Sequence, residues 1–322
     1  MIVYTEPRGA GHIPVIDLEP SFSADEASCT AVASRIGVAC RDTGFFYVSN
    51  HGVKREVVRA AFEQAARFFD RPLNWKSKYL KVPGTYGYEP SEALHLDNAS
   101  PGDLNESFNC SVTESPDAQD SVTNKWPSDI VGFRENIEAY STAMISLGLH
   151  ISRLLARSLD LSPHYFDEAL KHPTAALRLL RYPPQPSVTE FNQLGAGAHT
   201  DFGWITLLAQ DDCGGLEVQT AAGDWIRAEP IEDTFVVNLG DLVPRWTNGL
   251  YHSNMHRVLN NRSGRNRHSI AQFYNVAYAT RIECLPTCIR EGEVARFTPC
   301  TAGEHRMQRL KDAVRDPKKM TT

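Results

Sequence analysis

Hydrophobic positions recur with two different periods along this chain of 322 residues. In its first half, apolar side chains follow the 3.6-residue period of amphipathic helices. This spacing predicts helices over residues 23–43, 54–69 and 128–159, and a capping serine before a proline predicts a shorter helix starting near Ser162. After Pro173 the pattern changes to short apolar runs between turn residues, which is typical of strands. The strands expected there are 176–182, 204–209, 216–219, 225–227, 234–239, 256–259 and 269–276.

Two further strands, 13–18 and 45–48, are expected among the N-terminal helices. Residues 81–125 are rich in Gly, Pro, Ser, Asn and Asp, which predicts an irregular lid or substrate loop. Closely spaced strands joined by turns such as Gly214-Gly215 indicate an antiparallel sandwich or jelly roll. We therefore expect an α+β chain with a helical N-terminal region over 1–125 and a second region over 126–322. The second region contains the long supporting helix and a β core at about 174–282.

Composition narrows the classes of function. The formal net charge of −6 provides no basic field for a nucleic-acid backbone, so we expect a small-molecule substrate and no nucleic-acid partner. No apolar run approaches the roughly 18 residues of a membrane span, and the start of the chain lacks the pattern of a signal peptide. Seven cysteines without a C-x-x-C pair argue against a disulfide framework. We expect a cytoplasmic protein that is a monomer or a weak homo-oligomer.

The most informative short run is His199-Thr200-Asp201. In an extended strand, side chains two apart point to the same face, so the imidazole and the carboxylate can bind one ion. A third ligand is needed from elsewhere in the chain, and His256 can supply it, with His252 and His268 as further candidates. Two imidazoles and one carboxylate form the facial triad of non-haem Fe(II) oxygenases, which leaves the remaining metal positions open.

A second polar pair follows in the last predicted strand. Alternation places Arg267 and Ser269 on one face, where a guanidinium and a hydroxyl suit the carboxylate of a small acid. Tyr182 adds a polar group at the edge of the first core strand.

Several ordered motifs resemble the isopenicillin N synthase-like family of iron and 2-oxoglutarate-dependent oxygenases, and they extend over nearly the whole chain. The matching segments are 13–17, 44–52, 87–88, 106–108, 181–183, 199–201, 238–241, 247–249, 256–258 and 267–269. The resemblance implies a double-stranded β-helix core and makes His256, in its His-Arg-Val setting, the third ligand of Fe(II). It also implies that Arg267 and Ser269, helped by Tyr182, bind the distal carboxylate of 2-oxoglutarate.

By the same resemblance, the catalytic group is His199, Asp201 and His256, and the cofactors are Fe(II), 2-oxoglutarate and O2. In the family, decarboxylation of 2-oxoglutarate to succinate drives hydroxylation, desaturation or cyclisation of a small molecule. The positions expected to line the substrate pocket are Lys76, Tyr86, Phe108, Phe202 and Phe273.

Two alternatives remain at this stage. One is an isopenicillin N synthase-type Fe(II) oxidase that does not use 2-oxoglutarate, since Arg267 and Ser269 occur in both branches of the family. Thr85 stands where penicillin-forming members carry an arginine before the Gly-Tyr pair, which argues against a penicillin synthase itself. The other alternative is a non-catalytic metal-binding or sensor protein.

Overall fold

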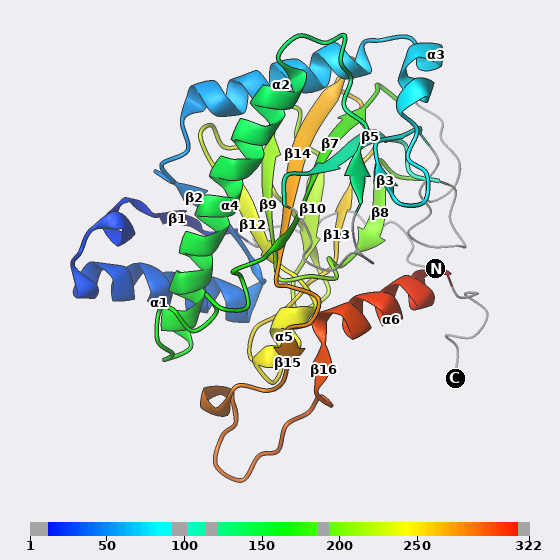
Figure 1. The fold of residues 1–322 in the computed structure, drawn as a ribbon. Helices are drawn as coiled ribbons and strands as arrows, with labels where there is room; N and C mark the ends of the chain where they lie inside the picture. The colour runs from blue at the N-terminus through cyan, green and yellow to red at the C-terminus, as the bar shows by residue number, and fades with distance from the viewer. Residues whose placement is uncertain (1–11, 92–101, 114–121, 186–192, 315–322) are drawn as a thin grey trace.

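The computed structural model describes residues 12–91, 102–113, 122–185, 193–314 of the chain (Figure 1). An eight-stranded sheet is its largest element, with the strand order β1-β2-β12-β9-β14-β7-β5-β4. Only the β1–β2 pair is parallel, and every other neighbouring pair is antiparallel. The strands are β1 (Val15–Asp17), β2 (Phe45–Ser49), β4 (Tyr88–Glu89), β5 (Glu106–Ser111), β7 (Thr174–Tyr182), β9 (Ile205–Gln210), β12 (Phe235–Leu239) and β14 (Arg267–Asn275).

A four-stranded antiparallel sheet, ordered β11-β10-β13-β8, forms the second layer. Its strands are β8 (Ala196–His199), β10 (Leu216–Gln219), β11 (Trp225–Arg227) and β13 (His256–Val258). Buried side chains of both sheets, including Leu180 and Val258, form one apolar cluster between the layers. Two antiparallel sheets facing each other in this way form the jelly-roll core that the sequence predicted.

Three helices cover the outer face of the large sheet, as Figure 1 shows: α1 (Glu26–Asp42), α2 (Arg55–Phe69) and α4 (Phe133–Ser158). Asp25 caps the N-terminus of helix α1, since its carboxylate accepts the backbone N–H of Ser28 at 2.9 Å. Helix α4 approaches β14 closely because Gly148 has no side chain: a Cβ there would lie 2.7 Å from Cδ1 of Tyr274. The long supporting helix and the two N-terminal helices are therefore confirmed, with their apolar faces on the sheet.

Helix α6 (Ala302–Val314) lies beside the end of the sandwich that carries α5 (Leu242–Trp246) (Figure 1). A two-stranded sheet of β15 (Arg281–Ile282) and β16 (Cys300–Thr301) leads into it. The remaining short elements are η1 (Glu19–Phe22), α3 (Leu73–Lys76), η2 (Ser77–Tyr79), β3 (Thr85–Tyr86), β6 (Thr123–Asn124) and η4 (Pro286–Cys288). None of the helices in the described part of the chain is long and apolar enough to cross a membrane.

The prediction of an irregular loop over 81–125 is wrong for its described centre, because β5 is a six-residue strand inside the large sheet. Its polar composition hid this strand: Glu106 is buried in a salt bridge with Lys76, Nζ to Oε2 2.6 Å. Residues 92–101 and 114–121 of the expected loop lie outside the described residues. The division of the chain near residue 125 stays a prediction, and strands from both sides of that point share one sheet.

Candidate active site

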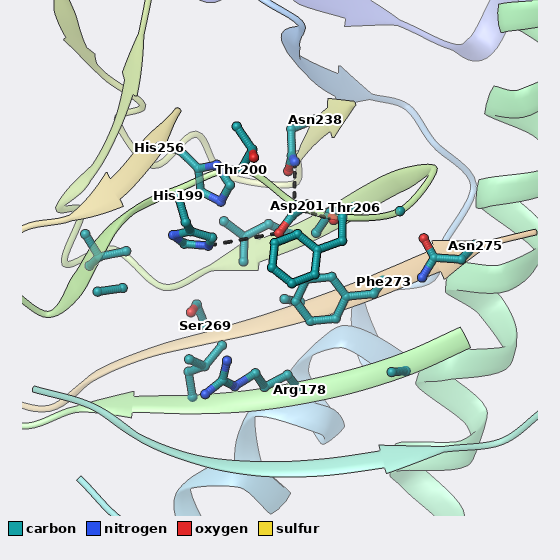
Figure 2. Close-up of a pocket in the computed structure, with 18 of the residues that line it drawn as sticks. Arg178, His199, Thr200, Asp201, Thr206, Asn238, His256, Ser269, Phe273 and Asn275 are labelled. Carbon is teal, nitrogen blue, oxygen red and sulfur yellow. Dashed lines mark hydrogen bonds and ion pairs between the residues drawn. The ribbon is translucent and has the colours of Figure 1, made fainter. Parts of the chain in front are cut away.

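Three side chains of the predicted metal site converge at one edge of the small sheet. His199 ends β8 and His256 begins β13, and the two residues are paired in register across these strands. Their rings lie 4.2 Å apart between centroids. Asp201 follows β8, and one ligand atom from each of the three residues lies within 4.8 Å of the others. Figure 2 shows His199, Asp201 and His256 facing a common space.

A hydrogen bond fixes the His199 imidazole, whereas the His256 imidazole has a nitrogen that is unpaired within the described part of the chain. Nδ1 of His199 lies 2.8 Å from the carbonyl oxygen of Gly197, which assigns the proton to Nδ1 and leaves Nε2 as a ligand atom. This Nε2 lies 4.0 Å from Oδ1 of Asp201. Nδ1 of His256 is buried and has no hydrogen-bond partner among the described residues. Such an unpaired buried nitrogen is expected at a site that binds an additional group.

The carboxylate of Asp201 is held through one oxygen only. Its Oδ2 accepts hydrogen bonds from Oγ1 of Thr206 at 2.6 Å and from Nδ2 of Asn238 at 2.7 Å (Figure 2). Oδ1, which faces His199, is left for a metal. Thr206 lies on β9 and Asn238 on β12, which are adjacent strands of the large sheet. The large sheet therefore orients Asp201, although Asp201 follows a strand of the small sheet.

The protonation states of His199 and Asp201 also favour the binding of a metal cation. Burial lowers the pKa of His199 to about 4; the neighbouring His256 acts in the same direction, and Asp201 and the Gly197 carbonyl act against it. Burial acts to raise the pKa of Asp201, but His256, His199 and its two hydrogen bonds bring it below the ordinary value. Near neutral pH the site therefore offers a neutral imidazole and a charged carboxylate, the donor forms that bind Fe(II).

These ligands lie in the wall of a cavity of about 370 Å³ between the two sheets. Tyr86, Phe202 and Phe273 line it, as expected for a substrate pocket. Arg267, Ser269 and Tyr182 line the same cavity.

The guanidinium of Arg267 is fixed by neutral partners. Nε donates to the carbonyl of Gly214 at 2.5 Å, Nη2 to Oε1 of Gln210 at 3.0 Å, and Nη1 lies 3.4 Å from the hydroxyl of Ser269. The Cζ atom of Arg267 lies 4.6 Å from the centroid of the Tyr182 ring. The tyrosine therefore contacts the guanidinium through the face of its ring.

Helix α6 closes one side of the cavity, and the sequence pattern contained no signal for this role. Arg309 forms a salt bridge with Asp241, Nε to Oδ2 2.9 Å, and donates to Oγ1 of Thr200 at 3.0 Å. Thr200 lies between two metal ligands, so α6 is joined directly to the ligand segment. The helix also brings Arg306 to the cavity wall.

Two expected pocket residues lie elsewhere. Phe108 is fully buried on the outer face of β5, where its ring packs against Phe68 at 4.8 Å and Phe133 at 5.3 Å. Lys76 is buried beside Glu106 in the same helix-covered layer. Both predictions were wrong because neither residue faces the space between the sheets.

The two alternative candidates for the third metal ligand, His252 and His268, lie outside the cluster of possible ligand atoms. His268 points to the opposite face of β14 from Arg267, and its ring lies 6.2 Å from that of Phe69. His252 is not part of the cluster of possible ligand atoms found among the described residues. His256 is therefore the histidine that joins His199 and Asp201.

Residues that the sequence did not single out complete the site. Thr206 and Asn238 orient Asp201, and Arg178 lines the cavity from β7. Asn238 belongs to the Asn-Leu-Gly-Asp motif of the family resemblance, whereas Thr206 and Arg178 looked like ordinary strand residues.

This fold and donor set define a mononuclear, non-haem metal enzyme with a substrate cavity. The family model of the 2OG-Fe(II) oxygenase superfamily matches residues 173–276, and the N-terminal model described as "non-haem dioxygenase in morphine synthesis N-terminal" matches residues 13–129. The chain belongs to the 2OG-Fe(II) oxygenase superfamily and is a non-haem Fe(II) dioxygenase.

Similar proteins match the chain along nearly its full length. The chain is 34% identical over 302 residues to the 2-oxoglutarate-Fe(II) type oxidoreductase hxnY of Emericella nidulans, covering 89% of this chain and 86% of that protein. It is 32% identical to a homoarginine-6-hydroxylase of Glycine max, covering 91% and 94%. Its structure resembles that of a full-length Neurospora crassa protein in complex with alpha-KG and thymine, with a TM-score of 0.85, 30% identity and coverage of 93% and 96%. The names of the last two proteins mention different small molecules, homoarginine and thymine, so the family alone does not define a substrate.

Proposed function

We propose that His199, Asp201 and His256 bind the catalytic Fe(II) and that Arg267 and Ser269 bind the distal carboxylate of 2-oxoglutarate. The overall reaction consumes O2, 2-oxoglutarate and a small molecule. It releases succinate, carbon dioxide and a substrate that has been hydroxylated, desaturated or cyclised.

One observation supports the 2-oxoglutarate site above the others: Arg267 is a buried cation held only by neutral groups. Its side chain is 2% exposed, and none of the carboxylates in the described ranges lies within salt-bridge distance of it. Burying an uncompensated charge is costly, so the site is suited to an anion supplied from outside the chain.

Arg257 is the matched contrast within the same core. It is equally buried, but its guanidinium meets the carboxylate of Glu217 at 2.8 and 2.7 Å. Arg257 is thereby neutralised by the protein itself, whereas Arg267 is available for a ligand.

Each residue then has a defined task. His199, Asp201 and His256 would hold the iron, which when bound would supply the oxidising power for coupling decarboxylation of 2-oxoglutarate to activation of O2. The hydrogen bonds of Thr206 and Asn238 orient the Asp201 carboxylate, so that Oδ1 remains directed to the metal. Tyr86, Phe202 and Phe273 provide an apolar wall that excludes water from the substrate.

The test is anaerobic addition of Fe(II) and 2-oxoglutarate, which produces a visible charge-transfer band when the keto acid chelates the metal. Arg267→Gln removes the charged donors, so we expect the 2-oxoglutarate concentration for half-maximal band to rise roughly 10- to 100-fold. The exposed Arg281→Gln is the control and should leave it unchanged, since Arg281 has a side chain 69% exposed. An unchanged band in Arg267→Gln would contradict the assignment.

Substrate-dependent succinate release separates the remaining alternatives. An isopenicillin N synthase-type oxidase would oxidise its substrate without forming succinate, and a sensor would form the band without turnover. Screening amino acids, small peptides and aromatic acids for compound-dependent succinate release decides between them.

We also propose that the enzyme works in the cytoplasm as a monomer or weak homo-oligomer without a nucleic-acid partner. Its net charge of −6 and its seven free cysteines support this setting. Size-exclusion chromatography with light scattering tests the oligomeric state.

A further inference from the structure

We propose that the substrate of this enzyme carries a carboxylate, and that Arg178 binds it with help from Arg306 at the mouth of the cavity. The inference rests on the proposed function, because it assigns the second ligand of the same cavity.

Arg178 faces the cavity because of its register in the large sheet. On β7 the even-numbered residues from Thr174 to Tyr182 line the cavity, and the odd-numbered ones face the helices. Figure 2 shows Arg178 across the cavity from His199 and His256. Its side chain is 20% exposed, yet Nε and Nη2 are buried and have no hydrogen-bond partner among the described residues. Buried guanidinium donors are normally satisfied, so these two are available to an acceptor on a ligand.

The nearby Glu89 does not use up this capacity. Its Oε2 lies 3.7 Å from Nη2 of Arg178, which is beyond a hydrogen bond. That oxygen already accepts from Asn109 at 2.7 Å and Ser107 at 3.2 Å, and Oε1 binds Lys81 at 2.8 Å. One carboxylate thus stands between two cations, Arg178 and Lys81. The group retains one net positive charge, which favours a bound anion.

Arg178 is separate from the 2-oxoglutarate site. Arg267 is paired with Tyr182 across β14 and β7, whereas Arg178 is paired with Ala271. Four residues along β14 correspond to about 13 Å between the two positions. The guanidinium of Arg267 donates to the carbonyl of Gly214, whereas the nearest carboxylate to the guanidinium of Arg178 is that of Glu89. The cavity therefore has two cationic anchors, and 2-oxoglutarate requires only one of them.

The mouth of the cavity carries a further cation and an aromatic rim. Arg306 of α6 lies with its guanidinium carbon 5.1 Å from the centroid of the Tyr278 ring, and Tyr86 lines the same region. Within the described part of the chain, Arg306 has no carboxylate at salt-bridge distance. An acid with an apolar or aromatic body fits this combination of two guanidinium groups with aromatic and aliphatic walls.

The experiment uses a panel of carboxylic acids of increasing size, each paired with its own primary amide. The amide keeps the shape and removes the charge. Succinate release that depends on an acid and is at least 10-fold weaker with its amide supports the inference. Release driven only by amides or other neutral compounds, or by no acid of the panel, overturns it.

Variants locate the anchor once an active acid is known. Arg178→Gln should raise KM for that acid roughly 10- to 100-fold, with a smaller effect on kcat, and Arg178→Lys should recover part of the loss. Arg306→Gln should raise KM less, because this residue is exposed. The control is Arg59→Gln on α2, whose side chain is 73% exposed and which should leave KM unchanged. An unchanged KM in Arg178→Gln refutes the assignment.

A second readout does not depend on turnover. The active acid should raise the melting temperature of the metal-free wild-type protein, and the amide should not; Arg178→Gln should lose this shift. The Fe(II)/2-oxoglutarate charge-transfer band is recorded in parallel. Absence of that band in the wild type would contradict the proposed function, whereas a normal band with no preference for acids would contradict only the substrate class.

Discussion

Replacing Thr206 by valine tests whether the hydrogen bonds behind Asp201 determine the affinity for iron. The hydroxyl of Thr206 donates to Oδ2 of Asp201 at 2.6 Å, and both residues are buried. Valine has nearly the same shape, so the substitution removes the donor with little change in packing. Asn238 still donates to the same oxygen at 2.7 Å and keeps the carboxylate in place.

The expected magnitude follows from the lost bond. A hydrogen bond to a charged group contributes about 1.5–3 kcal/mol, and removal of an outer-sphere partner of a metal ligand weakens metal binding roughly 10- to 100-fold. We expect Fe(II) affinity in Thr206→Val to fall within that range. The assay is an anaerobic titration with Fe(II) at saturating 2-oxoglutarate, in which the intensity of the charge-transfer band reports the amount of bound metal.

Thr247→Val is the matched control. Thr247 is also buried, and its hydroxyl donates to the carbonyl of Val243 at 2.9 Å and accepts the N–H of Tyr251 at 3.1 Å. This variant should lose about 1–3 kcal/mol of the free energy of unfolding without a specific change in Fe(II) affinity. Equal loss of Fe(II) affinity in both variants, or a change below twofold in Thr206→Val, would refute the role of the hydroxyl.

Two further predictions concern stability. Lys76→Met removes one cation from the buried carboxylate of Glu106, and because Arg181 also pairs with that carboxylate we expect a loss of about 2–3 kcal/mol in urea denaturation. A loss below about 0.5 kcal/mol would show that the buried pair does not stabilise the fold. Gly203→Ala places a Cβ 1.5 Å from Oδ1 of Asn275, so the asparagine must move and the loss in unfolding free energy should be about 1–3 kcal/mol. Wild-type stability in this variant would mean that the close approach does not restrict position 203.

Local features of the sequence predicted the secondary structure well. The helical period over 128–159 corresponds to α4, and all seven strands expected after Pro173 are present. These patterns succeed here because α4 buries one face and the strands are short apolar runs, of which β12 is buried on both faces. It failed for β5, where Glu106 is a buried charge whose partners lie far away in sequence.

The helix expected to start near Ser162 is absent as well. Residues 163–170 form turns in the structure. A capping serine followed by proline therefore marked the beginning of a turn segment and not of a helix.

The sequence by itself determined the local part of this protein: the periods of its helices and strands, and the two-residue spacing that turns His199 and Asp201 to one side. Only the tertiary structure decided which distant residues meet. The pairing of β8 with β13 brings His256 to His199, and the register of β7 turns Arg178 into the cavity. Docking of α6 adds Arg306 by contacts between segments far apart in the chain, and no local pattern encodes such contacts.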